Sequence, residues 1–343
     1  METILYLVHT NSDGSLPKVA LETLTAAKDL AAKLAGSKLI AGLIGEKTKA
    51  AADAIAGCGA VKFLTVEGPD FGASRYASDA FAAEKIVKAA GATLVLAPAT
   101  SRFARAIPGA AKRAGGSIDT HVSAIQADGG KVQISRWFYR QRMLGIMSRS
   151  SRPWFLLVDP GVFEAATEGV GSAAVEKVEA ALPESCRRTQ VVGIESPSAG
   201  TQTIRPDAKL LFVAGAGWTK KQSDGQTHLD DAGKHILGFL AKSQASLGSS
   251  KSLVDLSTEG GEVLNFMSHL NQVGQTGSTP RHPKGLATCC HGEEPHLVGS
   301  RFINERRAVN LDPNCGWAQG KADVLYVADA FKVMEKLNEL LVS

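Results

Sequence analysis

The sequence predicts an α/β protein built from two doubly wound domains. Short apolar runs rich in leucine or β-branched residues alternate with alanine-rich stretches of helical period, as expected for βαβ units and a parallel sheet. This alternation occurs twice, and a polar segment separates the two sets. A chain of 343 residues is also long enough that two hydrophobic cores are expected rather than one.

The first set occupies residues 1–183. Its apolar runs are continuous rather than alternating, which indicates strands buried on both faces of a sheet. The predicted strands are residues 4–8, 38–44, 61–66 and 93–97. The predicted helices are residues 17–35, 50–56, 77–90 and 102–114.

The pattern changes after Asp119. Three runs follow at the spacing of consecutive antiparallel strands, and Asp128-Gly129-Gly130 offers a tight turn between the first two. These runs are residues 122–126, 131–138 and 143–147. Residues 154–158 then return to an apolar strand.

Residues 184–207 are polar, interrupted by proline and glycine, and show no sustained period, so they predict a crossing segment between the domains. The second set occupies residues 208–343. Its predicted strands are residues 209–213, 285–288, 308–310 and 324–327. Its predicted helices are residues 229–246 and 330–342.

The charge pattern argues against nucleic-acid binding. Residues 136–142, with Arg149 and Arg152, interleave cations and aromatic rings as single-strand-binding surfaces do. However, a net charge of +4 is small for this length, so we prefer a basic strand pair packed on an acidic partner.

The cysteines do not form a disulfide or metal pattern. Cys58, Cys186, Cys289, Cys290 and Cys315 are an odd and scattered set, so free thiols are expected. A metal or iron–sulfur site at residues 289–296 with Cys315 is disfavoured, because adjacent cysteines ligate one ion poorly and no Cys-x-x-Cys occurs.

The chain enters an apolar run at Ile4 without a basic leader, and no apolar stretch is long enough to cross a bilayer. We therefore expect no membrane insertion and a location in the bacterial cytoplasm.

The most informative motif is Gln-Val-Gly-Gln-Thr-Gly at residues 272–277. Two glycines beside small hydrogen-bonding side chains allow the backbone to approach a ligand closely while the polar heads contact it. Taken alone, the string could equally be a chance turn, and its surroundings decide between the two interpretations.

The motif resembles the flavin loop of the electron transfer flavoprotein alpha subunit family. Four further segments resemble the same family in order and spacing, and five pieces in the right order make the chain a divergent member by resemblance. They are residues 96–113, 248–255 (Gly-Ser-Ser-Lys-Ser-Leu-Val-Asp), 308–313 (Ala-Val-Asn-Leu-Asp-Pro) and 322–331.

The resemblance implies a fold and a function. Residues 1–183 would form an adenine-nucleotide-hydrolase-like domain, with added antiparallel strands, that pairs with a beta subunit carrying AMP. Residues 208–343 would form a Rossmann-like domain that holds FAD without a covalent bond. The heterodimer would carry electrons from a flavin-containing dehydrogenase to a quinone oxidoreductase, which requires no catalytic acid or base.

The resemblance also implies a set of cofactor-binding residues in the second domain. They are Gly217, Ser250, Lys251, Val273, Gly274, Gln275, Thr276, His291, Gly292, Glu293, Glu294, Pro295, His296, Asn310, Asp329 and Ala330. Ser250 would bind the cofactor and Lys251 would place a positive charge over the flavin. His296 would lie near the flavin N1 and C2 carbonyl, whereas Asn310 and the Asp329-Ala330 pair would hold the adenosine part.

The chain departs from the family at several of these positions. Gly217 stands where the family has an arginine, unless Lys220 or Lys221 supplies the charge. Lys251 also replaces an arginine and lacks its planar fork. Glu293, Glu294 and Pro295 replace small and amide residues, and carboxylates near a flavin oppose its reduction.

These departures leave two alternatives open. One is a specialised or bifurcating electron carrier with a different dehydrogenase. The other is a flavin-free nucleotide-binding scaffold that descends from the same fold.

Overall fold

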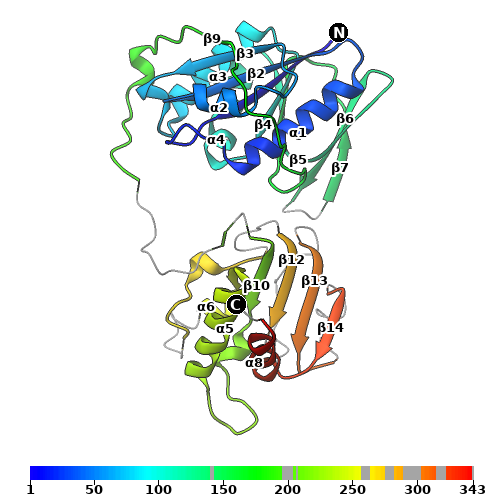
Figure 1. The fold of residues 1–343 in the computed structure, drawn as a ribbon, viewed down its shortest axis with the longest axis vertical. Coiled ribbons are helices and arrows are strands. Elements are labelled where there is room, and N and C mark those ends of the chain that lie inside the picture. Colours follow the sequence, from blue (N-terminus) through cyan, green and yellow to red (C-terminus); the bar gives the residue numbers. More distant parts are fainter. Residues whose placement is uncertain are drawn as a thin grey trace. The chain divides into compact units, whose positions relative to one another are not determined.

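The computed structural model describes residues 1–139, 143–194, 204–205, 208–255, 263–274, 282–288, 303–313 and 322–341. The chain divides into two compact units, Met1–Glu195 and Ser196–Ser343, here called the N-terminal and C-terminal units. Each is an α/β unit with its own sheet (Figure 1), which confirms the predicted fold class. The functional domain bounds, residues 1–183 and 208–343, stay predictions.

The N-terminal unit contains a nine-stranded sheet in the order β7-β6-β5-β8-β4-β1-β2-β3-β9. Its strands are β1 (Thr3–His9), β2 (Lys38–Gly45), β3 (Lys62–Glu67), β4 (Leu94–Pro98), β5 (Ser117–Asp128), β6 (Lys131–Phe138), β7 (Met143–Met147), β8 (Trp154–Val158) and β9 (Val175–Lys177). β1 pairs in parallel with β2 and β4, while β5, β6 and β7 form the predicted antiparallel set.

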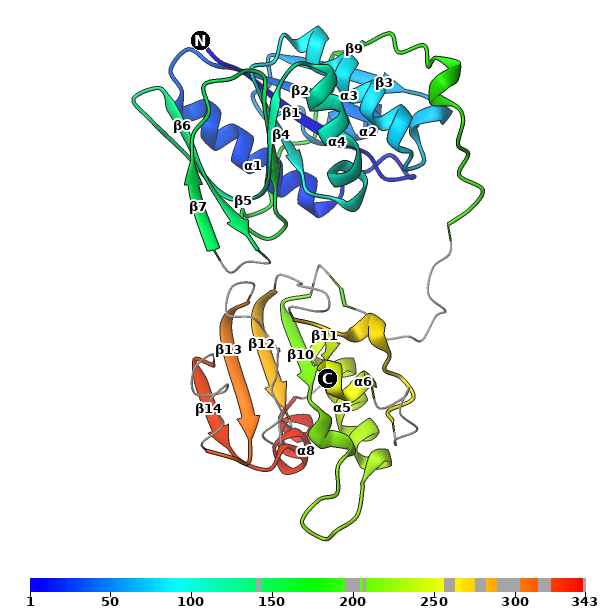
Figure 2. The same ribbon diagram turned by 180° about the vertical axis from the view of Figure 1, so that it is seen from behind.

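Helices cover both faces of this sheet. They are α1 (Lys18–Lys33), α2 (Lys49–Ala54), α3 (Tyr76–Ala90) and α4 (Ser101–Arg113). Alternate residues of β1 enter opposite cores: Tyr6 packs in the core that contains α1, and Leu7 packs in the core that contains α3 and α4. Figure 2 shows α1 along the sheet. Burial on both faces is the reason that the strand sequences are continuously apolar.

Two strands of this unit differ from the sequence prediction. β5 begins at Ser117 instead of residue 122, because its first residues pair in parallel with β8 before the strand turns to pair antiparallel with β6. β9 was not predicted, since three residues on the edge of the sheet carry no strand-like periodicity.

The basic strand pair finds its acidic partners inside the chain. Asp119 is fully buried and accepts hydrogen bonds from Arg136 (2.8 Å), Arg149 (2.5 Å) and Trp154 Nε1 (2.8 Å). Arg152 pairs with Glu2 at 2.7 Å. Burial alone would raise the pKa of Asp119, but the hydrogen bonds from Arg149, Trp154 and Arg136 outweigh it and hold that pKa below its usual value. The acidic partners of Arg136, Arg149 and Arg152 are therefore carboxylates of this same chain.

The C-terminal unit contains a five-stranded sheet in the order β11-β10-β12-β13-β14. Its strands are β10 (Leu210–Ala214), β11 (Ser246–Ser249), β12 (His282–Thr288), β13 (Ile303–Asn310) and β14 (Val324–Val327). Every neighbouring pair is parallel. Its described helices are α5 (Leu229–Ser243), α6 (Lys251–Asp255) and α8 (Ala330–Leu340).

Three predicted bounds in this unit are wrong. β12 begins at His282 instead of residue 285, and β13 begins at Ile303 instead of residue 308. The expected helix over residues 229–246 ends at Ser243, because Gln244 adopts a left-handed conformation (φ 54°) and turns the chain into β11. Ser246–Ser249 has little apolar character, so nothing in its pattern marks it as a strand. α5 and α8 pack together on one face of the sheet, around Phe212, Ile236 and Met334.

No helix in the described ranges is both long enough and apolar enough to cross a membrane.

Candidate functional site

The five parallel strands of the C-terminal unit end at the same edge of its sheet, here called the C-terminal sheet edge. Their last residues are Ala214, Ser249, Thr288, Asn310 and Val327. β11 and β12 lie on opposite sides of β10, which makes the end of β10 a topological switch point. Open α/β sheets bind ligands at such points, and the loops singled out from the sequence follow these strands.

The loop after β10 is held against β12. Gly215 N–H donates to the Thr288 carbonyl (2.9 Å), and the indole of fully buried Trp218 donates to Thr288 Oγ1 (2.9 Å). Trp218 also contacts the ring of Phe331, 4.5 Å away between centroids. Gly217 is buried in this turn. Of Lys220 and Lys221, the two lysines that could replace the family arginine, Lys221 is exposed. Trp218 was not singled out from the sequence, because a tryptophan after a glycine turn has no distinctive spacing.

Two neighbouring serines at the end of β11 differ in their hydrogen bonding: Ser249 is the last residue of the strand, and Ser250 follows it. Ser250 Oγ accepts a hydrogen bond from Leu253 N–H (3.1 Å) and so caps α6, although its hydroxyl hydrogen is still available as a donor. Ser249 is fully buried, and its Oγ has no hydrogen-bond partner among the described residues. Lys251 is exposed, and its ammonium lies 3.6 Å from Asp255.

The first residues of the Gln-Val-Gly-Gln-Thr-Gly motif at 272–277 lie beside β11. Gln272 forms a parallel bridge with Ser249, and Val273 N–H donates to the Ser249 carbonyl (3.1 Å). A Cβ on Gly248 would lie 2.9 Å from Val273 Cγ1, so glycine permits this close approach. The Val273 side chain is buried in the core, and only its backbone could contact a cofactor. Gly274 has φ +111°, a conformation that favours glycine.

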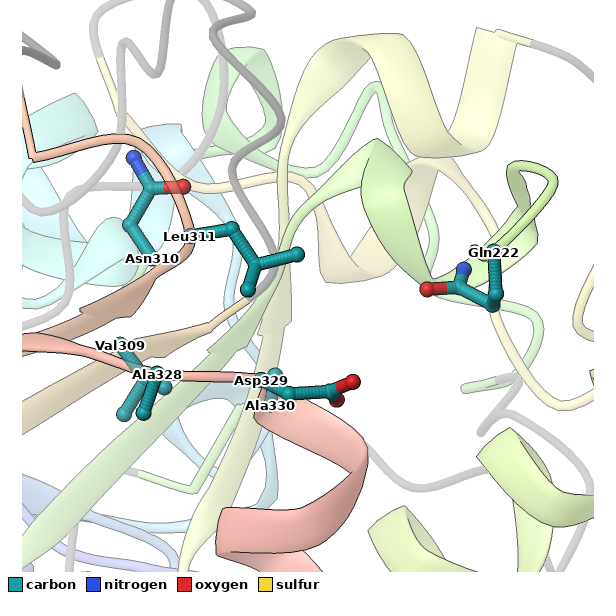
Figure 3. Close-up of a pocket in the computed structure, with 7 residues that line it drawn as sticks. All are labelled: Gln222, Val309, Asn310, Leu311, Ala328, Asp329 and Ala330. Carbon is teal, nitrogen blue, oxygen red and sulfur yellow. The ribbon is translucent and has the colours of Figure 1, made fainter. Parts of the chain in front are cut away.

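The ends of β13 and β14 border a hollow, here called the β13–β14 hollow (Figure 3). Its polar lining is Gln222, Asn310 and Asp329, and its apolar lining is Val309, Leu311, Ala328 and Ala330. Its cavity volume is about 10 Å³, room for about one water molecule, so only an edge of a larger ligand could enter it.

Asn310 and Asp329 have unequal roles in this hollow. Asp329 caps α8, because one of its carboxylate oxygens accepts a hydrogen bond from Phe331 N–H (2.8 Å). Asn310 is 2% exposed, and its Nδ2 has no hydrogen-bond partner in the described part of the chain. A buried amide donor without a partner is costly, and a ligand acceptor would remove that cost. Sequence reasoning named both residues but missed Gln222, which lies in an unremarkable polar turn.

The remaining predicted site residues lie outside the described residues. They are Gln275, Thr276, His291, Gly292, Glu293, Glu294, Pro295 and His296. The cysteines of the disfavoured metal site, at positions 289, 290 and 315, also lie outside. Cys58 and Cys186 are buried free thiols.

The N-terminal unit has a comparable edge, at the carboxyl ends of β1 and β4, here called the N-terminal sheet edge. His9 Nε2 lies 2.9 Å from Thr100 Oγ1, and the His9 ring packs edge-on against Phe103, 4.9 Å between centroids. Burial and the neighbouring Arg102 charge lower the pKa of His9 to about 4.

Arg102, in α4, links α3 to the segment after β3. Its guanidinium donates to Asp79 at 2.6 and 3.0 Å, and to the carbonyl oxygens of Phe71 (2.6 Å) and Gly72 (3.0 Å). The Arg102 and Asp79 side chains are 8% and 0% exposed. These side chains occupy the edge themselves and satisfy one another.

Fold and site together define a class: a two-unit α/β protein with a second parallel sheet. The edge of that sheet where open α/β sheets bind ligands carries glycine turns and, among the described residues, buried polar atoms without a partner. A sequence model of the electron transfer flavoprotein domain matches residues 4–183. The chain belongs to the electron transfer flavoprotein family.

Relatives extend this likeness over both units. The chain is 28% identical over 324 residues to "Protein FixB" of Clostridium saccharobutylicum, covering 92% of this chain and 88% of that protein. It is 26% identical to an electron transfer flavoprotein subunit alpha of Clostridium acetobutylicum, covering 95% of this chain and 93% of the relative. Identity to the subunit alpha of Bradyrhizobium diazoefficiens is 29%, covering 98% of each chain.

Proposed function

We propose that this chain is the alpha subunit of an electron transfer flavoprotein and that it binds FAD non-covalently at the C-terminal sheet edge. The single observation that carries the proposal is the convergence at one edge of the residues singled out after β10, β11, β13 and β14. Their spacing along the chain is large, and only a parallel sheet brings them together.

The chemistry of this edge suits a dinucleotide. Ser249 Oγ and Asn310 Nδ2 are buried polar atoms for which the described chain provides no partner. The glycine at 274 has no side chain that would keep a phosphate or a ring edge from its backbone groups. At the β13–β14 hollow, the polar side chains of Gln222, Asn310 and Asp329 would contact an edge of the adenosine end. When bound, FAD would supply the electron-carrying chemistry, and the protein would bind, orient and electrostatically adjust it.

The proposal includes the partners. A beta subunit that carries AMP would pair with residues 1–183, and residues 208–343 would hold the FAD. A flavin-containing dehydrogenase would donate electrons, and a quinone oxidoreductase would accept them. We place this carrier in the bacterial cytoplasm, as expected from the sequence.

Spectroscopy tests the proposal directly. The chain co-expressed with its beta subunit should purify as a yellow heterodimer. Its absorption spectrum should show one bound flavin per alpha chain, and acid should release FAD rather than FMN. A correctly folded, colourless heterodimer that takes up no added FAD would contradict the proposal and support the flavin-free scaffold instead.

One observation favours a specialised or bifurcating carrier as the second candidate. Gly217 supplies no side-chain charge, and the Lys251 ammonium lies 3.6 Å from Asp255, so less positive charge is available to favour a reduced flavin. The measured flavin potential, together with a test for reduction by NADH, distinguishes the two carriers. A low potential with NADH reactivity supports the second.

A further inference from the structure

The residue that the proposed function leaves unexplained is Gln222. It lies in the turn between β10 and α5, yet it lines the β13–β14 hollow together with Asn310 and Asp329. Almost ninety positions separate Gln222 from Asn310 in the sequence. A polar side chain that the fold brings over such a separation into a hollow merits a chemical explanation.

Hydrogen bonds determine the orientation of the Gln222 amide. Its Nε2 donates to the carbonyl oxygens of Gly217 (3.0 Å) and Lys220 (2.7 Å). Two carbonyl acceptors require the NH₂ group at that position, so the amide cannot be reversed. The carbonyl oxygen Oε1 is therefore left for the other side.

The backbone around Gln222 is held as firmly as its amide. Gln222 N–H donates to the Gln226 carbonyl (2.8 Å), and Gly225 N–H donates back to the Gln222 carbonyl (2.9 Å). Asp224 then joins this turn to the start of α5 through His228 (2.6 Å). Such a pre-arranged side chain loses little conformational entropy when it binds a ligand.

The two acceptors of the hollow face each other in Figure 3. The Gln222 amide oxygen points toward the side of Asp329, and the Asp329 carboxylate points toward Gln222. Gln222 Oε1 has no hydrogen-bond partner in the described ranges, and only one oxygen of Asp329 is used to cap α8. A ligand group with neighbouring hydroxyl donors suits two such acceptors, and the negative charge of Asp329 disfavours a phosphate there.

We propose that Gln222 is a specificity-determining residue that, together with Asp329, binds the 2′,3′-diol of the adenosine ribose and selects a nucleotide with a free 2′-hydroxyl. This inference rests on the proposed function and extends it to a residue of the β10–α5 turn.

Flavin binding to the heterodimer tests this assignment. The flavin is removed from the complex, and quenching of flavin fluorescence then gives dissociation constants for three probes. These are FAD, FMN and the anhydride of FMN with 2′-deoxyadenylate, which lacks only the 2′-hydroxyl. The wild-type complex should bind FAD about three- to tenfold more tightly than the deoxy analogue, the range for one lost hydrogen bond.

Gln222→Ala and the longer Gln222→Met should each weaken FAD binding by a similar factor and remove the preference for FAD over the deoxy analogue. The affinity for FMN, which has no adenosine, should be unchanged. Gln226→Ala is the matched control, because this exposed glutamine lies in the same turn and contributes a backbone bond that alanine keeps. It should bind all three probes like the wild type.

Three outcomes would overturn the assignment. If the Gln222 variants weaken FAD and the deoxy analogue equally, the residue shapes the loop and does not bind the ribose. If FMN binding falls in parallel, the effect is on the flavin end or on folding. A wild-type complex that binds no flavin at all would overturn the proposed function itself, and this assignment with it.

Discussion

The two sheet edges of this chain treat their buried polar groups differently. At the N-terminal sheet edge, Arg102 donates hydrogen bonds to Asp79 and to two backbone carbonyls, and Phe103 packs against His9. At the C-terminal sheet edge, Ser249 Oγ and Asn310 Nδ2 are buried without a partner among the residues that the structure describes.

The N-terminal unit also has buried polar atoms without a partner in the described ranges, Thr65 Oγ1 and Arg136 Nε among them, and one of these atoms lies at the N-terminal sheet edge itself, on Thr10. Its Oγ1 is also buried without a partner in the described ranges, but a Cβ on Gly45 would lie only 2.0 Å from it. This hydroxyl is packed against backbone, whereas Asn310 borders a hollow. A buried unpaired polar group costs about 1–3 kcal/mol, a cost that a ligand can remove only where it has access. The same architecture therefore suits scaffolding at one edge and binding at the other.

Removing the Arg102 guanidinium should produce the largest effect. Arg102→Met leaves the Asp79 carboxylate buried without its cation and should lower the free energy of unfolding by about 3–5 kcal/mol. Urea denaturation measures the loss. Arg105→Met, on the exposed side of the same helix, is the control and should cost under about 1 kcal/mol. A comparable small loss for Arg102→Met would remove the contrast between the edges.

The substitution Asp119→Asn should have the next largest effect. It removes the charge that Arg136 and Arg149 contact, and it should lower the free energy of unfolding by about 3 kcal/mol. Because the folded pKa of Asp119 lies below its unfolded value, this stabilisation is complete above the unfolded pKa of about 4 and disappears as the pH falls through the folded pKa. Urea denaturation between pH 7 and pH 3 should therefore show that the difference in unfolding free energy between the wild type and Asp119→Asn decreases as the pH falls. An advantage that is constant over this range would contradict the account.

His9 should make the N-terminal unit sensitive to milder acid. The unfolded chain binds the proton near pH 6.5 but the folded chain only near pH 4, so stability falls as the pH drops between these values. The loss should reach about 2 kcal/mol at pH 5. His9→Gln should remove that part of the pH dependence, as measured by urea titrations at pH 7.5 and 5. If the unfolding free energy changes with pH by the same amount in the wild type and in His9→Gln, His9 is solvated in the folded protein.

Asn310→Leu should give the smallest change in stability but a change in binding. Since Asn310 Nδ2 has no partner in the described chain, the flavin-free heterodimer should keep its unfolding free energy within about 1 kcal/mol. The affinity for FAD should fall by about tenfold, measured by fluorescence titration. A large stability loss with unchanged FAD affinity would mean that Asn310 serves the fold.

The strands that the sequence predicts best are those that a parallel sheet buries on both faces, such as β1 and β2, because burial imposes a continuous apolar run. β11 was missed because Ser246–Ser249 becomes a strand only through its neighbours β10 and the segment at Val273. Tertiary context of that kind leaves no local signal.

The candidate site follows the same division. Asn310 and Asp329 were accessible from the sequence because they end recognisable strands and resemble family positions. Gln222 was not, because its place in the hollow depends on hydrogen bonds to two carbonyl oxygens of a turn. The pairing of Arg136, Arg149 and Arg152 with Asp119 and Glu2 likewise depends on contacts between distant strands.

Hydrogen–deuterium exchange on the heterodimer, with and without FAD, tests the central claim most directly. The account predicts that FAD slows exchange at the C-terminal sheet edge, in peptides that contain Gly217, Ser250, Gly274, Asn310 and Asp329, and leaves peptides around His9 and Arg102 unchanged. Protection around His9 and Arg102 without protection at the C-terminal sheet edge would contradict it.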